Sequence, residues 1–233
     1  ECVETLEHQD HVTKVVASAD SSLVLTASTD GCARLWGVAS SGRACIQTFS
    51  GHKAGLTSVA FSVDSQQIIT ASFDCTAKIW NSLSGMCSQT LVGSPESAGH
   101  SDAVTSAVFS EDALLGLTAS RDQTAKLWDV QSGRCFQIFS QKRVRCRDDV
   151  MSSAVFAPDS STVLTASFAH CAQIWSVATG ECLRSLATPM LNFAVFSPDG
   201  KTVLTSADDN SARLWSAASG ECTLVLAGHD DAV

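Results

Sequence analysis

Five tryptophans divide this chain into segments of similar length. They are the only tryptophans among its 233 residues, and 40–48 residues separate each one from the next: Trp36, Trp80, Trp128, Trp175 and Trp215. Each ends nearly the same phrase: TASTDGCARLW, TASFDCTAKIW, TASRDQTAKLW, TASFAHCAQIW and TSADDNSARLW. A second phrase soon follows: SSGRACIQTF, LSGMCSQTL, QSGRCFQIF, ATGECLRSL and ASGECTLVL. A fixed period of this length predicts a repeat architecture, in which each unit needs its neighbours to bury its apolar faces.

The pattern inside each repeat predicts four short β-strands. The third repeat shows it as SAVF, LTAS, AKLW and CFQIF, runs of β-branched, aromatic and small apolar residues between turn-forming residues. In the AKLW run, Ala125 and Leu127 should face one side of the sheet, and Lys126 and Trp128 the other. Neither side is cleanly polar, as expected for a sheet between two others, and no 3.6-residue stripe predicts a helix. The fold class is therefore all-β, with four-stranded antiparallel sheets stacked radially.

Composition and charge exclude several classes of function. The apolar runs are far shorter than the roughly 18 residues of a membrane span, so we expect no membrane partner. A formal net charge of −9 argues against a general nucleic-acid surface, although it permits one local basic patch. Neither a zinc-spaced Cys/His set nor a phosphate-binding glycine loop occurs. We therefore predict a chain that is not an enzyme and has no cofactor or metal.

The cysteines follow the repeat. Six share one position, early in the fourth strand of a repeat: Cys2, Cys45, Cys87, Cys135, Cys182 and Cys222. Three more fall in third strands: Cys32, Cys75 and Cys171. Equivalent positions on neighbouring sheets lie too far apart for disulfides, so we interpret these nine as small buried apolar residues in a reducing, intracellular compartment, cytoplasmic or nuclear. Cys146, between Arg145 and Arg147, is either a reactive thiol with a lowered pKa or an ordinary loop cysteine.

These phrases resemble the WD repeat, in which a Gly-His pair precedes the tryptophan by about 28 residues and an aspartate often follows it. Here 28 residues separate His52 from Trp80, and one repeat keeps a literal Trp128-Asp129. The resemblance covers essentially the whole chain. It implies a β-propeller that acts as a non-catalytic scaffold and binds a partner peptide or domain on its narrow face.

In that family a histidine, a turn aspartate, a second-strand hydroxyl and the tryptophan form a hydrogen-bonded network inside each blade. The matching residues here are His8, Asp30 and Trp36; His52, Asp74 and Trp80; His100, Asp122 and Trp128; Trp175; and Asp209 with Trp215. The hydroxyl could come from either member of three pairs: Thr26 or Ser28, Thr70 or Ser72, and Thr118 or Ser120. Since a catalytic nucleophile occurs once, in a cleft, we interpret these recurring residues as buried structural groups rather than as a triad.

Two repeats depart from this pattern. Repeat four has Arg147 and Ala169 where histidine and aspartate are expected, and repeat five has Ala187 at the histidine position. Both blades should lack the full network and be the less stable ones.

The repeat boundaries predict one domain over residues 1–233. Its blades should span approximately residues 8–49, 52–91, 100–139, 147–186 and 187–226. Residues 1–6 match the outer strand of a preceding blade, and residues 228–233 match the start of a further one. Because the fifth repeat already has its own outer strand, we expect five full blades in an open arc of a seven-bladed ring. Closure as a five-bladed ring is the alternative.

Two joints between repeats are longer than the others, VGSPESAGHSDAV and SQKRVRCRDDV, and the resemblance places both on the narrow face. The second carries four cations in an acidic protein: Lys142, Arg143, Arg145 and Arg147. This segment is either a solvated loop or a docking point for an acidic or phosphorylated segment of a partner protein.

Two other functions stay open as alternatives. A carboxylate-dependent propeller hydrolase would use Asp102 or the pair Asp148-Asp149, although Asp10 occupies the position equivalent to Asp102, which favours a structural role. Nucleic-acid binding would use the basic segment 142–147.

Overall fold

A computed structural model describes residues 5–38, 45–94, 97–140, 150–168, 171–188 and 190–227. The first sheet contains β1 (Val12–Ala17), β2 (Leu23–Ser28), β3 (Cys32–Gly37) and β4 (Cys45–Ser50). The second contains β5 (Leu56–Phe61), β6 (Gln67–Ser72), β7 (Ala77–Asn81) and β8 (Cys87–Leu91). The third contains β11 (Val104–Phe109), β12 (Leu115–Ser120), β13 (Thr124–Asp129) and β14 (Cys135–Ser140). The fourth contains β15 (Met151–Phe156), β16 (Thr162–Ser167), β17 (Cys171–Ser176) and β18 (Cys182–Ala187). The fifth contains β19 (Leu191–Phe196), β20 (Thr202–Ala207), β21 (Ser211–Ser216) and β22 (Cys222–Ala227).

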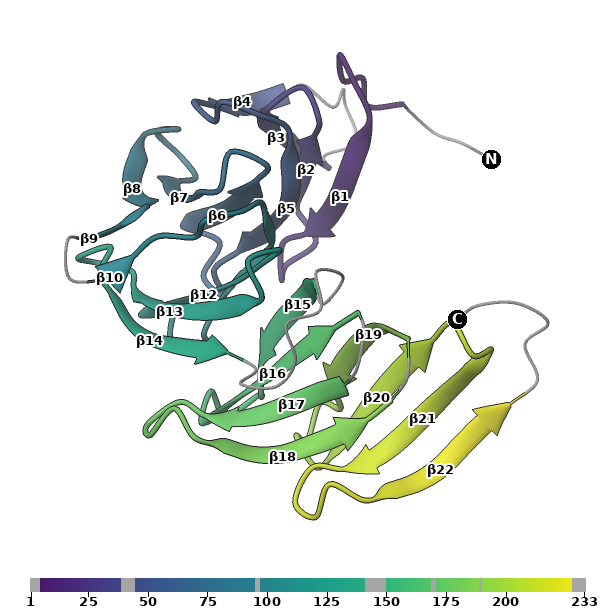
Figure 1. Ribbon diagram of the computed structural model, residues 1–233. Coiled ribbons are helices and arrows are strands. Elements are labelled where there is room, and N and C mark those ends of the chain that lie inside the picture. Colours follow the sequence, from purple (N-terminus) through teal and green to yellow (C-terminus); the bar gives the residue numbers. More distant parts are fainter. Residues whose placement is uncertain are drawn as a thin grey trace.

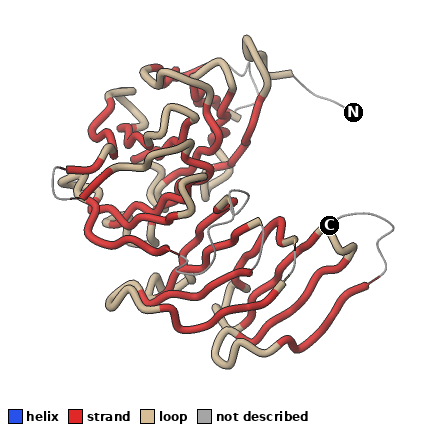
Figure 2. Tube along the Cα trace, in the orientation of Figure 1, coloured by secondary structure: helices blue, strands red, loops and turns tan. Residues whose placement is uncertain are grey.

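The predicted all-β class and the four-stranded sheets are confirmed. Strands in each sheet are antiparallel and follow chain order, and Figure 2 shows strands and loops but no helix in the described residues. A short hairpin of β9 (Gly93–Ser94) and β10 (Ser97–Ala98) occupies the longer joint before the third sheet. The joint before the fourth sheet, residues 141–149, lies outside the described residues.

Serine and aspartate close the turns between the first and second strands of a sheet. In the second sheet the Ser62 hydroxyl donates to Asp64 Oδ1 over 2.6 Å, and the Gln67 N–H donates to Ser62 Oγ over 2.9 Å. The intervening Ser65 has a φ of 57°, which a serine tolerates when side chains satisfy the turn. The same Ser-x-Asp arrangement recurs at Ser110 and Ser197, which explains why short polar triplets reverse the chain at this point of several repeats.

The five sheets stack one upon the next along a curve, with β1, β5, β11, β15 and β19 on its inner side (Figure 1). Each seam is filled by the tryptophan of the later sheet. Trp128 is fully buried in a cluster with Ile69, Ile79 and Leu91 of the preceding sheet. A buried indole removes about 150–250 Å² of surface from water. One tryptophan in each repeat therefore provides the apolar group that fills the seam with the preceding sheet.

Polar contacts reinforce the seams at their inner and outer ends. On the inner strands a hydroxyl donates to a carbonyl of the next sheet, as Thr57 Oγ1 does to Val104 O over 2.5 Å. Near the outer edge, Gly133 has a φ of 67°, and a Cβ there would lie 2.8 Å from Gln89 Oε1 of the preceding sheet. Gln89 Nε2 also donates to Gln131 O over 2.7 Å. The positive φ favours glycine at this position of the Ser-Gly phrase, and a larger residue would also require the Gln89 side chain to shift.

The arc is open in the described residues. Four apolar clusters each join two consecutive sheets, and among the described residues none of them joins the fifth sheet to the first. Figure 1 accordingly shows β1 and the β19–β22 sheet at the two ends of the curve. Membership of a seven-bladed ring stays a prediction, and residues 1–4 and 228–233, assigned to flanking blades, lie outside the described residues.

The interpretation of the cysteines as buried residues is wrong for half of those described. Cys45, Cys87, Cys182 and Cys222 are exposed, Cys135 is buried, and Cys32, Cys75 and Cys171 are half-buried. The exposed ones begin the outermost strands β4, β8, β18 and β22, whereas Cys135 at the same position of β14 is buried. All eight are free thiols, whereas Cys2 and Cys146 lie outside the described residues.

Candidate functional site

A tight turn joins the second and third strands of each sheet, and an aspartate side chain closes it in the second sheet. Asp74 Oδ1 accepts hydrogen bonds from the Thr76 N–H over 3.0 Å and from its hydroxyl over 2.6 Å. The Asp74 N–H donates to Ser72 Oγ over 3.1 Å, and Cys75, between Asp74 and Thr76, has a φ of 67°. The aspartate recurs in this turn as Asp30, Asp122 and Asp209. In each of these turns the aspartate carboxylate accepts a hydrogen bond from the main-chain N–H two residues later, as a carbonyl would in a main-chain turn. This hydrogen bond holds the turn backbone in one conformation.

A chain of hydrogen bonds connects this turn to the tryptophan. Trp80 Nε1 donates to Thr70 Oγ1 over 2.9 Å, and Thr70 Oγ1 lies 2.8 Å from His52 Nε2. His52 Nδ1 lies 2.9 Å from Asp74 Oδ2. Since an indole N–H can only donate, the threonine hydroxyl accepts from it and donates to a neutral histidine, which donates to the carboxylate. The third sheet repeats the chain with Trp128, Thr118, His100 and Asp122 at 2.8, 2.7 and 2.9 Å.

Threonine rather than serine supplies the hydroxyl. Thr26, Thr70, Thr118, Thr165 and Thr205 each accept the indole N–H of their own sheet. The serine two residues later serves the turn instead, because Ser72 Oγ donates to the Ala54 and Gly55 carbonyls over 3.0 Å.

Burial and hydrogen bonding shift the pKa values within the network. Burial lowers the pKa of both His52 and His100 below 6.5, although the adjacent aspartate partly opposes this shift. Burial alone would raise the pKa of Asp74, but hydrogen bonds from Thr76, the Lys53 N–H and His52 lower it to about 2. At neutral pH the network therefore holds a neutral imidazole beside a carboxylate.

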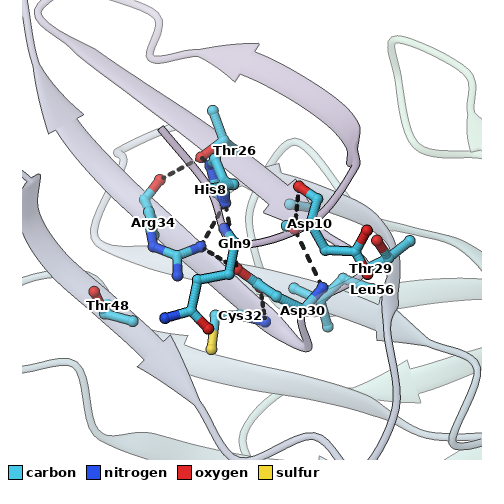
Figure 3. A network of polar contacts seen from close by, with 12 residues as sticks. His8, Gln9, Asp10, Thr26, Thr29, Asp30, Cys32, Arg34, Thr48 and Leu56 are labelled. Carbon is cyan, nitrogen blue, oxygen red and sulfur yellow. Dashed lines mark hydrogen bonds and ion pairs between the residues drawn. The ribbon is translucent and has the colours of Figure 1, made fainter. Parts of the chain in front are cut away.

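The first sheet departs from this arrangement because an arginine enters the network (Figure 3). Arg34 Nη1 forms an ion pair with Asp30 Oδ2 at 2.7 Å, whereas His8 Nδ1 lies 3.8 Å from the same oxygen. His8 Nε2 keeps its contact with Thr26 Oγ1 at 2.6 Å. Arg34 was not predicted as part of the network, although an arginine four residues after the turn aspartate marks both this repeat and the fifth.

The last two sheets have reduced networks. In the fifth, Asp209 pairs with Arg213 at 2.6 Å, and Ala187 leaves no histidine to join them. In the fourth, Trp175 still donates to Thr165 over 2.9 Å, while the expected Arg147 and Ala169 lie outside the described residues. Buried Gln173 Oε1 of that sheet has no hydrogen-bond partner among the described residues.

The residue before the turn aspartate varies, although its backbone does not. We call these the variable turn residues: Thr29, Phe73, Arg121, Phe168 and Asp208. Each donates its N–H to a carbonyl just before the first strand of the same sheet, namely His11, Gly55, Ala103, Val150 and Met190, over 2.9–3.0 Å. Phe73 and Phe168 are exposed by 42% and 46% of their area, and the Arg121 guanidinium lies 5.4 Å from the Phe73 ring centre. This set was not predicted, although its signal is the variable fourth letter of the phrases TASTD, TASFD and TASRD.

The basic segment predicted to bind a partner joins this same end of the sheets. Lys142, Arg143, Arg145 and Arg147 all lie outside the described residues. Their segment runs from Ser140, which pairs with Thr124 just after the turn of the third sheet, to Val150, whose carbonyl accepts the Phe168 N–H. We call this end of the described sheets, with the variable turn residues, the turn face.

The structure adds little support to the two alternative functions, a carboxylate-dependent hydrolase and a nucleic-acid-binding protein. Asp102 and Asp10 each accept a hydrogen bond from the N–H of the next residue, at 2.6 and 2.8 Å, so the two equivalent carboxylates share a structural contact. Asp148, Asp149, Asp230 and Asp231 lie outside the described residues. Within the described ranges, no cluster of three or more His, Cys, Asp or Glu side chains could hold a metal ion. No helix in the same ranges is long and apolar enough to span a membrane.

Comparison with known proteins agrees with the fold. A search of curated proteins returns no match. The family model described as WD domain, G-beta repeat matches residues 1–37, 43–81, 86–129 and 180–216, together more than half of the chain. Its matches leave out residues 130–179, which hold the repeat without the turn aspartate. On the combined strength of these matches and the five four-stranded sheets, the chain belongs to the WD-repeat family, whose members generally serve as scaffolds for protein–protein interaction.

Proposed function

We propose that this chain is a non-catalytic scaffold that binds a partner peptide or domain on its turn face. The variable turn residues carry the proposal. Their main chains are fixed by the same hydrogen bond in all five sheets, while their side chains differ in size, charge and polarity. A constant framework that presents a different side chain at each position is suited to recognition, because little conformational freedom is lost on binding.

Two exposed phenylalanines provide the apolar part of this surface. Phe73 and Phe168 lie on the second and fourth sheets, and Arg121 on the sheet between them reaches over the Phe73 ring. Aromatic and arginine side chains are the types that most often dominate binding energy at protein interfaces.

The basic segment supplies the charge of the proposed site. Lys142, Arg143, Arg145 and Arg147 account for four of the 15 Lys and Arg residues in a chain of net charge −9. The described residues at the two ends of the segment are Ser140, which pairs with Thr124, and Val150, whose carbonyl accepts the Phe168 N–H. Guanidinium groups bind carboxylates and phosphates through paired hydrogen bonds, which favours an acidic or phosphorylated partner segment.

A peptide array tests this proposal. It carries degenerate peptides with phosphoserine, glutamate or serine at one fixed position, and is probed with the wild-type chain and with the double variant Arg143→Glu/Arg145→Glu. We expect the wild-type chain to bind the peptides with phosphoserine or glutamate at the fixed position. The variant should not bind them, although its melting temperature should equal that of the wild type.

The matched control reverses two cations at the opposite end of the sheets, Arg134→Glu/Lys201→Glu. These residues lie in the turns that lead from β13 to β14 and from β19 to β20. Equal loss of binding in this control would show a general effect of charge. Retention of the peptides by the Arg143/Arg145 variant would exclude the basic segment as the docking point.

A further inference from the structure

A groove of about 630 Å³ lies between the second and third sheets, at the end opposite the turn face. The second sheet contributes the β5–β6 turn and the adjoining ends of β6, β7 and β8, and the third sheet contributes the turns β11–β12 and β13–β14. Every lining residue is described, and both sheets have a neighbour on each side, so both walls of the groove lie within the described arc. A volume of roughly 300–1,000 Å³ is usual for a ligand-binding cleft.

Carboxamide side chains form most of the polar lining of this groove. Gln66, Gln67 and Gln131 use their main chains for hydrogen bonds with other described residues, so their side-chain ends are left for a ligand. Asn81 Oδ1 accepts two hydrogen bonds from Ser84, over 2.8 and 2.9 Å, which orients the amide and leaves Nδ2 to donate. A carboxamide donates and accepts as a peptide group does, so this lining matches the main chain of an extended peptide.

Exposed apolar side chains accompany these amides. Leu114 lines the groove and is exposed by 64% of its area. Leu83 and Met86, exposed by 87% and 70%, lie in the β7–β8 turn that follows Asn81. Other sheets have polar residues at two of these positions: Ser22, Ser161 and Lys201 in place of Leu114, and Arg134, Glu181 and Glu221 in place of Met86. Apolar side chains gathered on the surface around a groove are typical of a site that binds another molecule.

The charge around the groove is negative. Asp129 lines it, and hydrogen bonds from the Ser132 N–H and hydroxyl reach its Oδ1 over 2.7 and 2.5 Å, which leaves Oδ2 for a ligand. The described turns at this end of the sheets carry Asp20, Asp64, Glu111, Asp112, Asp159, Glu181, Asp199 and Glu221, against Arg134 and Lys201. A surface of this sign attracts a basic segment and repels an acidic one.

We propose that this groove binds a basic segment of a second partner protein. The carboxamides pair with the main chain of the segment, Asp129 with a lysine or arginine side chain, and Leu114 with an apolar side chain nearby. Because the groove and the turn face lie at opposite ends of the sheets, the chain can hold a basic partner in the groove while the turn face is occupied. The groove needs no residue of the turn face, so this proposal does not depend on the one above.

Two substitutions probe the groove with residues that other sheets already have at the same positions. Asp129→Asn removes the charge and retains the Oδ1 acceptor, as Asn81 does in the second sheet. Leu114→Ser introduces the residue of the first and fourth sheets. Asp199→Asn is the matched control, because it removes one charge at the same end of the fifth sheet, outside the groove. The melting temperature of each variant shows that it folds as the wild type does.

A peptide array followed by fluorescence polarisation supplies the measurement. The array carries degenerate peptides with arginine, glutamate or alanine at one fixed position and leucine two residues later. We expect the wild type to bind the arginine peptides in preference to the glutamate peptides. For the tightest arginine peptide, labelled with fluorescein, Asp129→Asn and Leu114→Ser should each raise the dissociation constant by about tenfold, the effect of losing one charge-assisted hydrogen bond or one apolar contact. Asp199→Asn should leave the dissociation constant unchanged.

Three results would overturn the proposal: equal binding of arginine and glutamate peptides, an unchanged dissociation constant in either groove variant, or an equal loss in Asp129→Asn and Asp199→Asn, which would indicate a general effect of surface charge. The turn-face variant Arg143→Glu/Arg145→Glu should still bind the arginine peptide. An excess of phosphoserine peptide should not displace the arginine peptide from the wild type. These two measurements separate the groove from the turn face, so either site can fail while the other stands.

Discussion

At the scale of single residues, the threonine in the middle of the second strand is the shared element of all five networks. Thr118 is fully buried, accepts the Trp128 indole N–H and lies 2.7 Å from His100 Nε2. Even the fourth and fifth sheets, which lack the histidine, keep the threonine–indole bond. The histidine and aspartate extend this bond to the turn, so they determine how firmly the turn is held rather than whether the sheet forms.

We expect Thr118→Val to destabilise the chain by about 1–3 kcal/mol, because valine preserves the shape but leaves two buried groups without their partner. Urea unfolding followed by tryptophan fluorescence measures the change. Thr162→Val, at a half-buried position that begins a second strand in the fourth sheet, is the control and should cost far less. Equal costs for the two substitutions would contradict the role assigned to Thr118.

Stability should fall as the solution is acidified. The pKa values of His52 and His100 lie below 6.5 in the folded chain, so the unfolded chain takes up protons first as the pH drops below about 6.5. The pKa of Asp74, lowered from 3.8 to about 2, adds a second loss of stability as the pH falls from about 4 towards 2.

Urea unfolding at about pH 7.5 and about pH 5.5 separates the histidine contribution. The double variant His52→Gln/His100→Gln should lose less stability between these two pH values than the wild type does. His11→Gln, whose imidazole is 93% exposed, should behave as the wild type. An unchanged pH dependence in the double variant would rule out these two histidines as its source.

At the scale of one element, the second, third and fourth sheets allow a direct comparison, because each has a neighbour on both sides. The second and third contain the whole network from indole to carboxylate. The fourth retains only its threonine–indole bond among the described residues, and Gln173 there has a buried oxygen without a partner. Differences in local stability among these three sheets should therefore arise from their hydrogen-bond networks and not from the number of sheets packed against them.

Amide hydrogen exchange should be faster in β16 and β17 than in β12 and β13, by an amount corresponding to about 1–3 kcal/mol of local opening free energy. Mass spectrometry of peptic fragments resolves the two strand pairs. Equal or slower exchange in β16 and β17 would mean that the histidine and aspartate contribute little to the stability of a blade.

At the scale of the whole molecule, the main contacts between sheets in the described residues join consecutive sheets, so the stability of the arc is approximately a sum over sheets and seams. The two end sheets each have one seam where the inner sheets have two. Among the described residues, Val15 of the first sheet and Leu226 of the fifth are exposed by 58% and 42%, whereas the equivalent residues of the sheets with a neighbour on that side are buried.

The same substitution at one position in two sheets measures this difference. Leu186→Ala, at a fully buried site in the seam between the fourth and fifth sheets, should cost about 2–5 kcal/mol. Leu226→Ala, at the equivalent site in the fifth sheet and 42% exposed, should cost close to the 0.5 kcal/mol or so of a surface substitution at protein concentrations that keep the chain monomeric. Similar costs at the two sites would show that the arc closes on itself.

The sequence by itself determined the number of sheets, the four strands in each and the burial of the five tryptophans. Its period and its four strand-like runs per repeat favour a radial stack, since one such sheet cannot cover its own faces. It also identified the histidines and aspartates of the second and third networks, because the same letters recur at the same spacing.

Only the tertiary structure decided which hydroxyl joins the network, how Arg34 displaces His8 from Asp30, and which cysteines reach solvent. Thr70 and Ser72 lie two residues apart on one strand and point to the same side, so no pattern in the sequence distinguishes them. Arg34 reaches Asp30 across a turn, and Cys45 is exposed whereas Cys135 at the equivalent position is buried, both of which depend on three-dimensional position. Local periodicity is encoded along the chain, whereas the choice among equally spaced partners depends on distances that exist only once the sheets have stacked.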